Sequence, residues 1–290
     1  MCGGFALETE LIARYAVIGH PITHSRSPEI HAAFAVSTGR NIRYERIEGS
    51  LPGFEEEALR FFEEGGSGLN VTLPFKERAL ALTSRCTERA LCAGAANTLG
   101  FGPEGIWADN TDGIGLVRDL VNNLGVELQG ADVLLLGAGG AARGVIQPLF
   151  EAGASALWVV NRTRARAERL VAELGVVCAA KSMQSVSWSD LSTLQGFNLI
   201  LNATSSSVNG EWLGLPDNIF LKDSWAYDLG YGQSLTPFLQ NAQQLGVTRL
   251  SDGLGMLVEQ AAESFQAWHG VRPETRGVIG GLRSRITPSV

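Results

Sequence analysis

Short apolar runs alternate with helical patterns along the chain. The runs lie at Tyr15–Ile18, Leu69–Leu73, Val133–Leu136, Leu157–Val160, Leu199–Asn202 and Ala226–Leu229. Such alternation is typical of α/β proteins with parallel sheets, because a helix must carry the chain back between parallel strands. After Leu250, apolar residues at 254, 257, 258, 261, 265 and 268 form one stripe at the helical period, and Asp252-Gly253 predicts the start of that helix.

The chain divides best at the polar, glycine-bearing stretch Asp109–Gly115, which separates two differently built halves. A length of 290 residues is consistent with about two domains. Hydrophobic residues make up 45% and charged residues 18%, which excludes a disordered chain and allows a sizeable core. The net charge of −7 argues against nucleic acid or an anionic membrane as the main partner.

The cysteines, at positions 2, 86, 92 and 178, form no CxxC pair. This pattern predicts reduced thiols in a cytoplasmic protein. The N-terminus has no basic start followed by an apolar segment, as a signal peptide would. The longest apolar tract, Val133–Phe150, is interrupted by Gly-Ala-Gly-Gly and by Arg143, so we expect a strand, a turn and a helix in a soluble protein.

A glycine-rich turn follows the apolar run that ends at Leu136. Gly137, Gly139 and Ala142 form a Gly-x-Gly-x-x-Ala pattern directly after a predicted strand and at the start of a predicted helix. In dinucleotide-binding proteins such a turn brings pyrophosphate to the backbone and to the helix N-terminus. The alternative is a glycine-rich turn with a purely structural role.

The segment after the next strand carries no acid. An NAD site usually places Asp or Glu there to bind the ribose hydroxyls, whereas this chain has Asn161-Arg-Thr-Arg-Ala-Arg166. Arginines with Asn and Thr can bind a 2′-phosphate, which predicts NADP as the cofactor. The alternative is a solvated basic helix start, since Arg169 continues the run.

Two serines stand at the start of a predicted helix in the first half. Ser27 suits an N-cap with Pro28 at the first helical position, and capping is an alternative explanation for its presence. Ser25 is not needed for capping. Two hydroxyls at a helix start can form a small anion site suited to a carboxylate.

A strand at 68–74 leads to a lysine. Asn70 and Thr72 alternate along this strand and should point the same way, and Pro74 should end it. Lys76 opens a predicted helix, Glu77–Leu82, where the helix dipole should lower its proton affinity. We interpret this lysine as placed for chemistry, the alternative being an exposed surface lysine.

Further polar clusters occur at Asn97-Thr98 and Asp109-Asn-Thr-Asp-Gly113. Such clusters are commonly turns. Together with the serines, Asn70, Thr72 and Lys76, however, they supply the partners that a polyhydroxylated carboxylic acid requires. The four histidines, at 20, 24, 31 and 269, show no spacing that completes a metal site, so we predict no metal and interpret them as core or loop residues.

These motifs resemble the shikimate dehydrogenase family, the NADP-dependent enzymes of the aromatic amino-acid (chorismate) pathway. The matching stretches occur in the family's order and span residues 15 to about 270. They are Tyr15–Pro28, Asn70–Lys76, Gly94–Thr98, Asp109–Gly113, Gly137–Ala141, Asn161–Thr163, Asn202–Thr204, Tyr227–Leu229 with Tyr231, and Asp252–Met256 with Gln260.

The resemblance implies a two-domain α/β fold. An N-terminal substrate domain (1–113 and 253–290) would be joined to a Rossmann-type NADP domain (114–252), and the C-terminal helices would return to the first domain. It also implies a catalytic pair, Lys76 and Asp112. The implied substrate ligands are Ser25, Ser27, Asn70, Thr72, Asn97, Asp112, Tyr231 and Gln260. The implied cofactor ligands are Gly137, Ala138, Gly139, Gly140, Ala141, Asn161, Arg162, Thr163, Arg164, Ala165, Arg166, Leu229 and Gly253.

The implied reaction is the reversible NADPH-dependent reduction of 3-dehydroshikimate to shikimate by a monomer or homodimer. A quinate/shikimate dehydrogenase and a regulatory NADP-binding protein on the same fold remain alternatives. Ser27, the missing acid after the second cofactor strand, and the Lys76–Asp112 pair argue against them. Two regions depart from the family: Ser205–Ser207 replace a frequent glycine, and the first 14 residues have no match and are expected to be disordered.

Overall fold

The computed structural model describes residues 12–83, 85–177, 182–204 and 214–286. Cys2, Cys178, the Ser205–Ser207 loop and most of the unmatched N-terminal segment lie outside the described residues. The expectation of disorder through residue 14 is wrong at its end, because Ala13 and Arg14 already belong to the first strand. Both residues pair in register with the neighbouring strand, which fixes them.

A first six-stranded sheet has the order β2-β1-β3-β5-β6-β4. Its strands are β1 (Ala13–Gly19), β2 (Ile42–Glu48), β3 (Gly66–Val71), β4 (Arg85–Cys86), β5 (Thr98–Gly102) and β6 (Gly105–Asp109). Its helices are α1 (Ser27–Thr38), α2 (Phe54–Glu63), α3 (Lys76–Ala81) and α4 (Glu88–Ala93). The expectation of parallel pairing is only partly right here, because β5 runs antiparallel to both β3 and β6. The two-residue turn between β5 and β6 can join only antiparallel strands.

A second six-stranded sheet is parallel throughout, in the order β12-β11-β10-β7-β8-β9. Its strands are β7 (Asp132–Leu136), β8 (Ala156–Val160), β9 (Ser182–Val186), β10 (Phe197–Asn202), β11 (Phe220–Asp228) and β12 (Arg249–Asp252). The helical segments around it are α6 (Gly140–Glu151), α7 (Arg164–Val177), η2 (Trp188–Thr193), η3 (Asp217–Ile219) and α9 (Pro237–Gln244). This is the doubly wound Rossmann order, in which the strand order reverses between β7 and β10, the place where ligands bind in such sheets.

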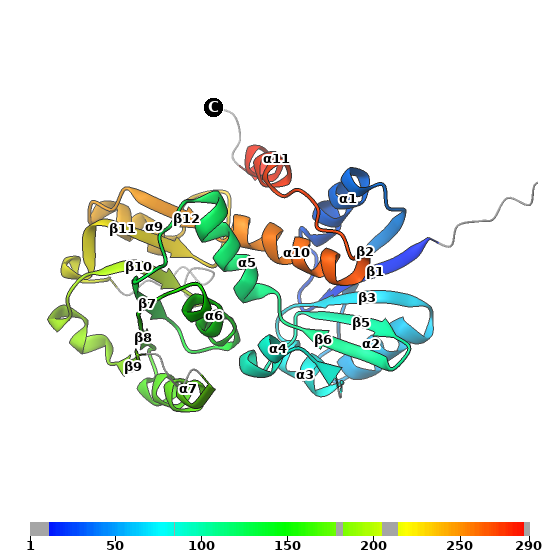
Figure 1. Cartoon of the computed structure of the whole chain (residues 1–290), viewed down its shortest axis with the longest axis horizontal. Coiled ribbons are helices and arrows are strands. Elements are labelled where there is room, and N and C mark those ends of the chain that lie inside the picture. The colour runs from blue at the N-terminus through cyan, green and yellow to red at the C-terminus, as the bar shows by residue number, and fades with distance from the viewer. Residues whose placement is uncertain (1–11, 84, 178–181, 205–213, 287–290) are drawn as a thin grey trace, which may run out of the picture.

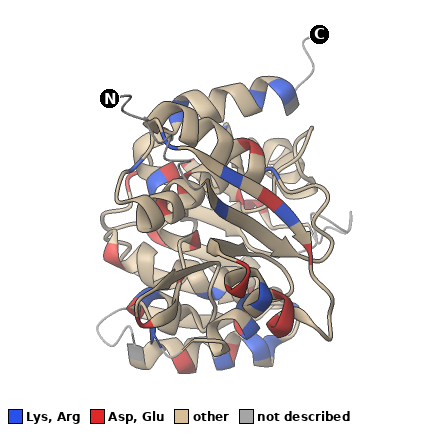
Figure 2. Ribbon diagram, turned by 90° about the vertical axis from the view of Figure 1, so that its right-hand side faces the viewer, with Lys and Arg blue, Asp and Glu red and all other residues tan. Residues whose placement is uncertain are grey.

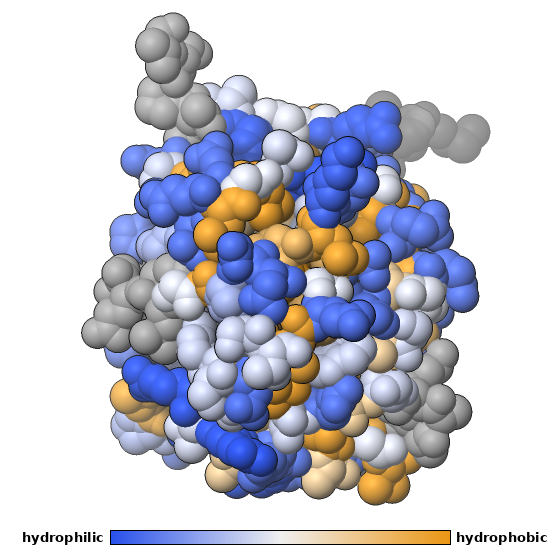
Figure 3. Space-filling view, turned by 90° about the vertical axis from the view of Figure 1, so that its left-hand side faces the viewer, coloured by the Kyte–Doolittle hydropathy of each residue, from blue (hydrophilic) through white to orange (hydrophobic). Residues whose placement is uncertain are grey.

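Both faces of the second sheet are covered. Val133 and Leu135 point into one core with α6, whereas Leu134 and Leu136 point into another with α9. This alternation explains why β7 is a continuous apolar run rather than apolar at every second residue. On the outer face of this half, hydrophobic residues lie in small groups among hydrophilic ones (Figure 3).

Two helices lie between the sheets (Figure 1): α5 (Asp112–Arg118), continued by η1 (Asp119–Asn123), and α10 (Leu254–His269). Glycines allow the helices to approach closely. A Cβ on Gly115 would lie 2.7 Å from the Gln260 backbone nitrogen, and one on Gly113 would lie 2.3 Å from the Gly144 carbonyl oxygen. The start of α5, which carries Asp112, is therefore held tightly against α10 and α6.

Helix α10 is buried on more than the predicted stripe. Leu254, Val258 and Phe265 pack with α1 and α11 (Arg276–Ile286), as the apolar pattern indicated. The polar face is buried as well, since Glu259 is 2% and Ser264 0% exposed. The helix begins after Asp252-Gly253 as predicted, and Asp252 Oδ1 accepts a hydrogen bond from Leu254 N at 3.3 Å.

Acidic and basic residues are intermixed over the side of the molecule that carries the first sheet (Figure 2). In the described ranges, no helix is both long enough and apolar enough to span a membrane.

Candidate active site

Lys76 and Asp112 meet at the junction of the two sheets. Lys76 is the first residue of α3 and Asp112 the first of α5. Lys76 Nζ donates to Asp112 Oδ2 at 2.5 Å, and the two side chains are 23% and 11% exposed. The helix after the lysine begins at Lys76 and ends at Ala81, not at Glu77 and Leu82 as predicted. The contact between the amine and the carboxylate, thirty-six positions apart, is present.

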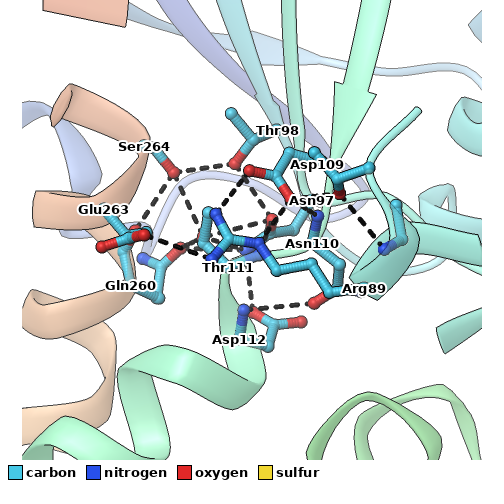
Figure 4. A network of polar contacts seen from close by, with 12 residues as sticks. Arg89, Asn97, Thr98, Asp109, Asn110, Thr111, Asp112, Gln260, Glu263 and Ser264 are labelled. Atoms are coloured by element: carbon cyan, nitrogen blue, oxygen red, sulfur yellow. Dashed lines mark hydrogen bonds and ion pairs between the residues drawn. The ribbon is translucent and has the colours of Figure 1, made fainter. Parts of the chain in front are cut away.

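Asp112 is also held from its other side. Asn97 Nδ2 donates to Asp112 Oδ1 at 2.9 Å and lies 3.1 Å from Gln260 Oε1, while Thr111 N donates to Asn97 Oδ1 at 2.8 Å. Figure 4 shows these side chains in one connected network. Asn97 therefore binds the carboxylate that accepts from Lys76, and Gln260 and Thr111 lie next to Asn97.

Asn70, at the buried end of β3, extends the same network. Its Nδ2 donates to Asn97 O and to Ser264 Oγ, both at 3.1 Å. Tyr44 Oη donates to Asn70 Oδ1 at 2.7 Å. Sequence reasoning missed Tyr44 and Ser264. A second, polar stripe on α10, with Gln260 and Ser264 four residues apart, is the signal that could have identified Ser264.

Thr72 lies beyond the strand on which it was expected. β3 ends at Val71 rather than near Pro74, because the chain turns and Phe75 N donates to Thr72 O at 3.0 Å. The alternation argument therefore applies to Asn70 and not to Thr72. Thr72 remains close to β1, since its N donates to Ile18 O at 2.9 Å.

Ser25 and Ser27 are adjacent at the start of α1. Ser25 Oγ lies 3.2 Å from Ser27 Oγ and accepts from Ser27 N at 3.3 Å. Ser27 is the first helical residue and Arg26 the N-cap, without a side-chain capping bond, so the N-cap interpretation of Ser27 is wrong. Neither serine is thus the N-cap, although Ser25 Oγ binds the first N–H of the helix, and Ser27 is 7% exposed. Tyr231, in the loop after β11, is 37% exposed.

The glycine-rich turn between β7 and α6 is formed as expected. Gly137 has φ +112°, and a Cβ there would lie 2.9 Å from Ala203 O, so the position requires glycine. No atom lies within 4 Å of a Cβ built on Gly139 or Gly140. A cavity of about 370 Å³ is lined by Ala138, Gly139 and Gly140 of the turn, by Arg143, Arg166 and Arg169, and by Glu77 and Glu173, the last of which is the ion-pair partner of Arg143. Exposed backbone at a helix N-terminus with basic side chains nearby suits a phosphate-bearing cofactor.

The segment Asn161–Arg166 leads from β8 into α7, and its residues 162–166 are exposed. Asn161 Nδ2 donates to Thr163 O at 2.9 Å, which orders the turn. Arg164 forms an ion pair with Glu168 at 2.7 Å. Within the described part of the chain, no ion pair includes Arg162 or Arg166. Their guanidinium groups are therefore available to a ligand.

Leu229 and Gly253, two implied cofactor ligands from different parts of the chain, lie against each other. A Cβ on Gly253 would be 2.2 Å from Leu229 O, and Gly253 N donates to Gly230 O at 3.0 Å. Both follow the carboxyl ends of neighbouring parallel strands, β11 and β12, at the edge of the second sheet where cofactors bind.

His31 lies in the core and His20 in the loop after β1. His31 is fully buried, its ring stacks on Tyr44 with centroids 4.2 Å apart, and burial lowers its pKa to about 3. His20 Nδ1 forms a pair with Glu48 at 2.7 Å. Among the described residues, no group of three or more His, Cys, Asp and Glu side chains could hold a metal ion.

Comparison with known proteins gives a consistent result. Three family models match in order: the shikimate dehydrogenase substrate binding domain over 17–99, shikimate / quinate 5-dehydrogenase over 119–209, and the shikimate 5′-dehydrogenase C-terminal domain over 253–279. Shikimate dehydrogenase (NADP(+)) of Nitrosospira multiformis is 54% identical over 275 residues, covering 94% of this chain and 98% of that protein.

Two crystal structures extend the comparison. An Ael1 enzyme from Pseudomonas putida has 47% identity and a TM-score of 0.87, with 96% of this chain and 99% of that one covered. Shikimate 5-dehydrogenase from Thermus thermophilus, in complex with NADP(H) and shikimate, has 34% identity and a TM-score of 0.83, with 95% and 100% covered. Similarity of this extent shows that the chain belongs to the shikimate dehydrogenase family.

Proposed function

We propose that this protein is an NADP-dependent shikimate 3-dehydrogenase that interconverts 3-dehydroshikimate and shikimate on the chorismate pathway to aromatic amino acids. The observation that carries the proposal is the 2.5 Å contact between Lys76 Nζ and Asp112 Oδ2 at the junction of the sheets. The names of its relatives support both the substrate and the cofactor. The open glycine turn is compatible with NADP, as are Arg162 and Arg166, which no ion pair of the described residues includes.

When bound, NADP(H) would supply or accept the hydride at the substrate carbon that carries the reacting oxygen. That oxygen must gain a proton during reduction, and the protein has to provide it. Lys76 would donate this proton and would take it back in the reverse direction. Asp112 orients the amine by accepting a hydrogen bond from it, and Asn97 holds the other carboxylate oxygen in place.

The substrate would lie between the two serines and the Lys76–Asp112 pair. Ser25 and Ser27 would bind its carboxylate at the start of α1. The other polar groups of the substrate would be bound by Asn70, Thr72, Asn97, Asp112, Tyr231 and Gln260. The cofactor would contact Gly137–Ala141, Asn161–Arg166, Leu229 and Gly253.

We also propose that residues 1–113 and 253–290 form the substrate domain and residues 114–252 the NADP domain. The enzyme would act in the cytoplasm as a monomer or homodimer. Cys86 and Cys92 are free thiols, which supports a reducing compartment.

Absorbance assays with shikimate or quinate, each with NADP or NAD, test the function. We expect the highest kcat/KM with shikimate and NADP. Equal turnover of quinate would instead support a quinate/shikimate dehydrogenase. No activity in any of the four combinations would contradict the proposal and favour a regulatory NADP-binding protein.

The role of Lys76 is tested by Lys76→Ala. Because loss of a positioned acid–base group typically costs about 100- to 10,000-fold, we expect kcat to fall by that factor while the KM for shikimate stays within about threefold. Lys222→Ala, at an exposed position on β11, is the control. If kcat stays near the wild-type value and only KM rises, Lys76 is an anchor and not the acid.

A further inference from the structure

A charged cluster lies directly behind the proposed catalytic pair, and the mechanism above does not use it. Its centre is Arg89 on α4, whose side chain is 30% exposed and whose Nε and Nη2 donate to Asp109 Oδ1 and Oδ2 at 2.7 and 2.6 Å. Asp109, at the end of β6, is 3% exposed. A guanidinium that binds both oxygens of a carboxylate fixes its orientation as well as its position.

Asp109 in turn holds the segment that leads to Asp112. Its Oδ1 accepts from Asn110 N at 2.7 Å and from Thr87 Oγ1 at 2.6 Å. Asn110 Oδ1 then accepts from Asp112 N at 3.1 Å. A continuous path of hydrogen bonds therefore runs from Arg89 to the backbone of Asp112 (Figure 4).

The same guanidinium also contacts α10. Arg89 Nη1 pairs with Glu263 on α10 at 3.2 Å, and Glu263 also pairs with Arg118 at the end of α5, at 3.1 Å. Glu263 lies between Gln260 and the end of α10, on the helix that also carries Ser264. Arg89 thus links the segment before Asp112 to both α4 and α10.

A purely stabilising role explains this arrangement poorly. Compared with apolar side chains of similar size, such ion pairs contribute little net stability. A contact between a guanidinium and both oxygens of a carboxylate, however, adds geometric specificity. Another cation of the same cluster, Arg272, pairs with Glu263 at 3.0 Å and with Glu259 at 2.5 Å, and its ion pairs within the described chain do not include Asp109. The two arginines share one carboxylate and differ in whether they bind the segment leading to Asp112.

We propose that Arg89 is a positioning residue for the reaction: by binding Asp109 at two points, it sets the direction in which Asp112 presents its carboxylate to Lys76. The role rests on the proposed function, because it acts through the proposed catalytic pair. A lysine at position 89 would keep the charge and lose the two-point contact.

The test compares Arg89→Lys and Arg89→Ala with the matched variant Arg272→Lys, in the full-length enzyme with shikimate and NADP. Displacing a catalytic group by about 1 Å can cost about 100-fold, so we expect kcat to fall about 10- to 100-fold in both Arg89 variants. The KM for shikimate should stay within about threefold, and Arg272→Lys should keep kcat within about twofold.

One further measurement separates positioning from stability. Added guanidinium chloride at millimolar concentration should restore part of the kcat of Arg89→Ala and none of the kcat of Lys76→Ala.

Several outcomes would overturn the role of Arg89. These are a kcat within twofold of wild type in Arg89→Lys, no rescue of Arg89→Ala by guanidinium chloride, an equal loss in Arg272→Lys, or a failure of Arg89→Lys to fold while Arg272→Lys folds. An inactive wild-type enzyme would refute the proposed function instead. The two failures are therefore distinguishable.

Discussion

Arg162 and Arg166 differ from Arg164, although all three are exposed in the same segment after β8. Arg164 is engaged by Glu168, and no ion pair of the described ranges involves the other two. A charge-assisted hydrogen bond to a phosphate contributes about 1.5–3 kcal/mol. We therefore expect Arg162→Ala and Arg166→Ala each to raise the Kd for NADP about 10- to 100-fold while leaving the Kd for NAD nearly unchanged.

Arg43→Ala, at an exposed and ion-paired position on β2, is the control for these variants, and fluorescence titration of the cofactor is the measurement. It should change the Kd for NADP by less than about twofold, because it lies on the first sheet and outside the proposed cofactor contacts. Equal weakening of NADP and NAD would show that the arginines support the turn and do not read the 2′-phosphate.

At the residue scale, the sequence predicted which residues lie in the site better than it predicted which residues contact them. Lys76, Asp112, Asn97 and Gln260 could be named, and they do lie together. Arg89 could not be found in this way, because an arginine in a short helix has the same pattern whether its side chain faces water or a buried carboxylate. The distinction depends on β6 bringing Asp109 to α4, which is a tertiary contact.

At the scale of elements, the approach of α5 to α10 is set by the small residue at position 115. A Cβ on Gly115 would lie 2.7 Å from both Cβ and N of Gln260, and backbone atoms cannot move aside cheaply. We expect Gly115→Ala to lower the free energy of unfolding by about 1–3 kcal/mol. It should also lower kcat, since the displaced helix carries Asp112.

Gly280→Ala in α11 provides the comparison. Nothing lies within 4 Å of a Cβ at this position, so alanine should be neutral or stabilising by up to about 1 kcal/mol. Urea unfolding and steady-state kinetics measure both effects. Equal stability of the two variants would mean that α5 and α10 can separate without cost.

The elements themselves were predicted unevenly. Buried strands such as β7 and β8 were identified within a residue or two, because both faces of a parallel sheet are apolar. β2 was not predicted, since its sequence Ile-Arg-Tyr-Glu-Arg-Ile-Glu places charged residues between the apolar ones and has no apolar run. The burial of the polar face of α10 was not predicted either. It depends on the ion pair between Glu259 and Arg272, a residue that follows the end of the helix.

At the scale of the whole molecule, α10 takes part in the cores of both halves. Met256 packs into the core of the second sheet, whereas Leu254 and Val258 pack with Phe34 of α1. Side chains of η1 contact α10 and the second sheet, since Asn123 Nδ2 donates to Glu259 Oε1 at 3.0 Å and Asp119 Oδ2 accepts from Tyr227 Oη of β11 at 2.8 Å. Unfolding either sheet alone would expose one face of α10 and leave buried polar groups without partners.

Scanning calorimetry should therefore show one unfolding transition that the cofactor moves as a unit. At 100 times its Kd, NADP should add about 2.7 kcal/mol. With an unfolding entropy of about 2.1 cal/mol/K per residue, this corresponds to a rise in Tm of about 4 °C. NAD at the same concentration is the control and should produce a smaller shift. Two transitions, of which NADP moves only one, would show that α10 does not couple the halves. Cofactor binding at the second sheet would then not stabilise the region around the Lys76–Asp112 contact.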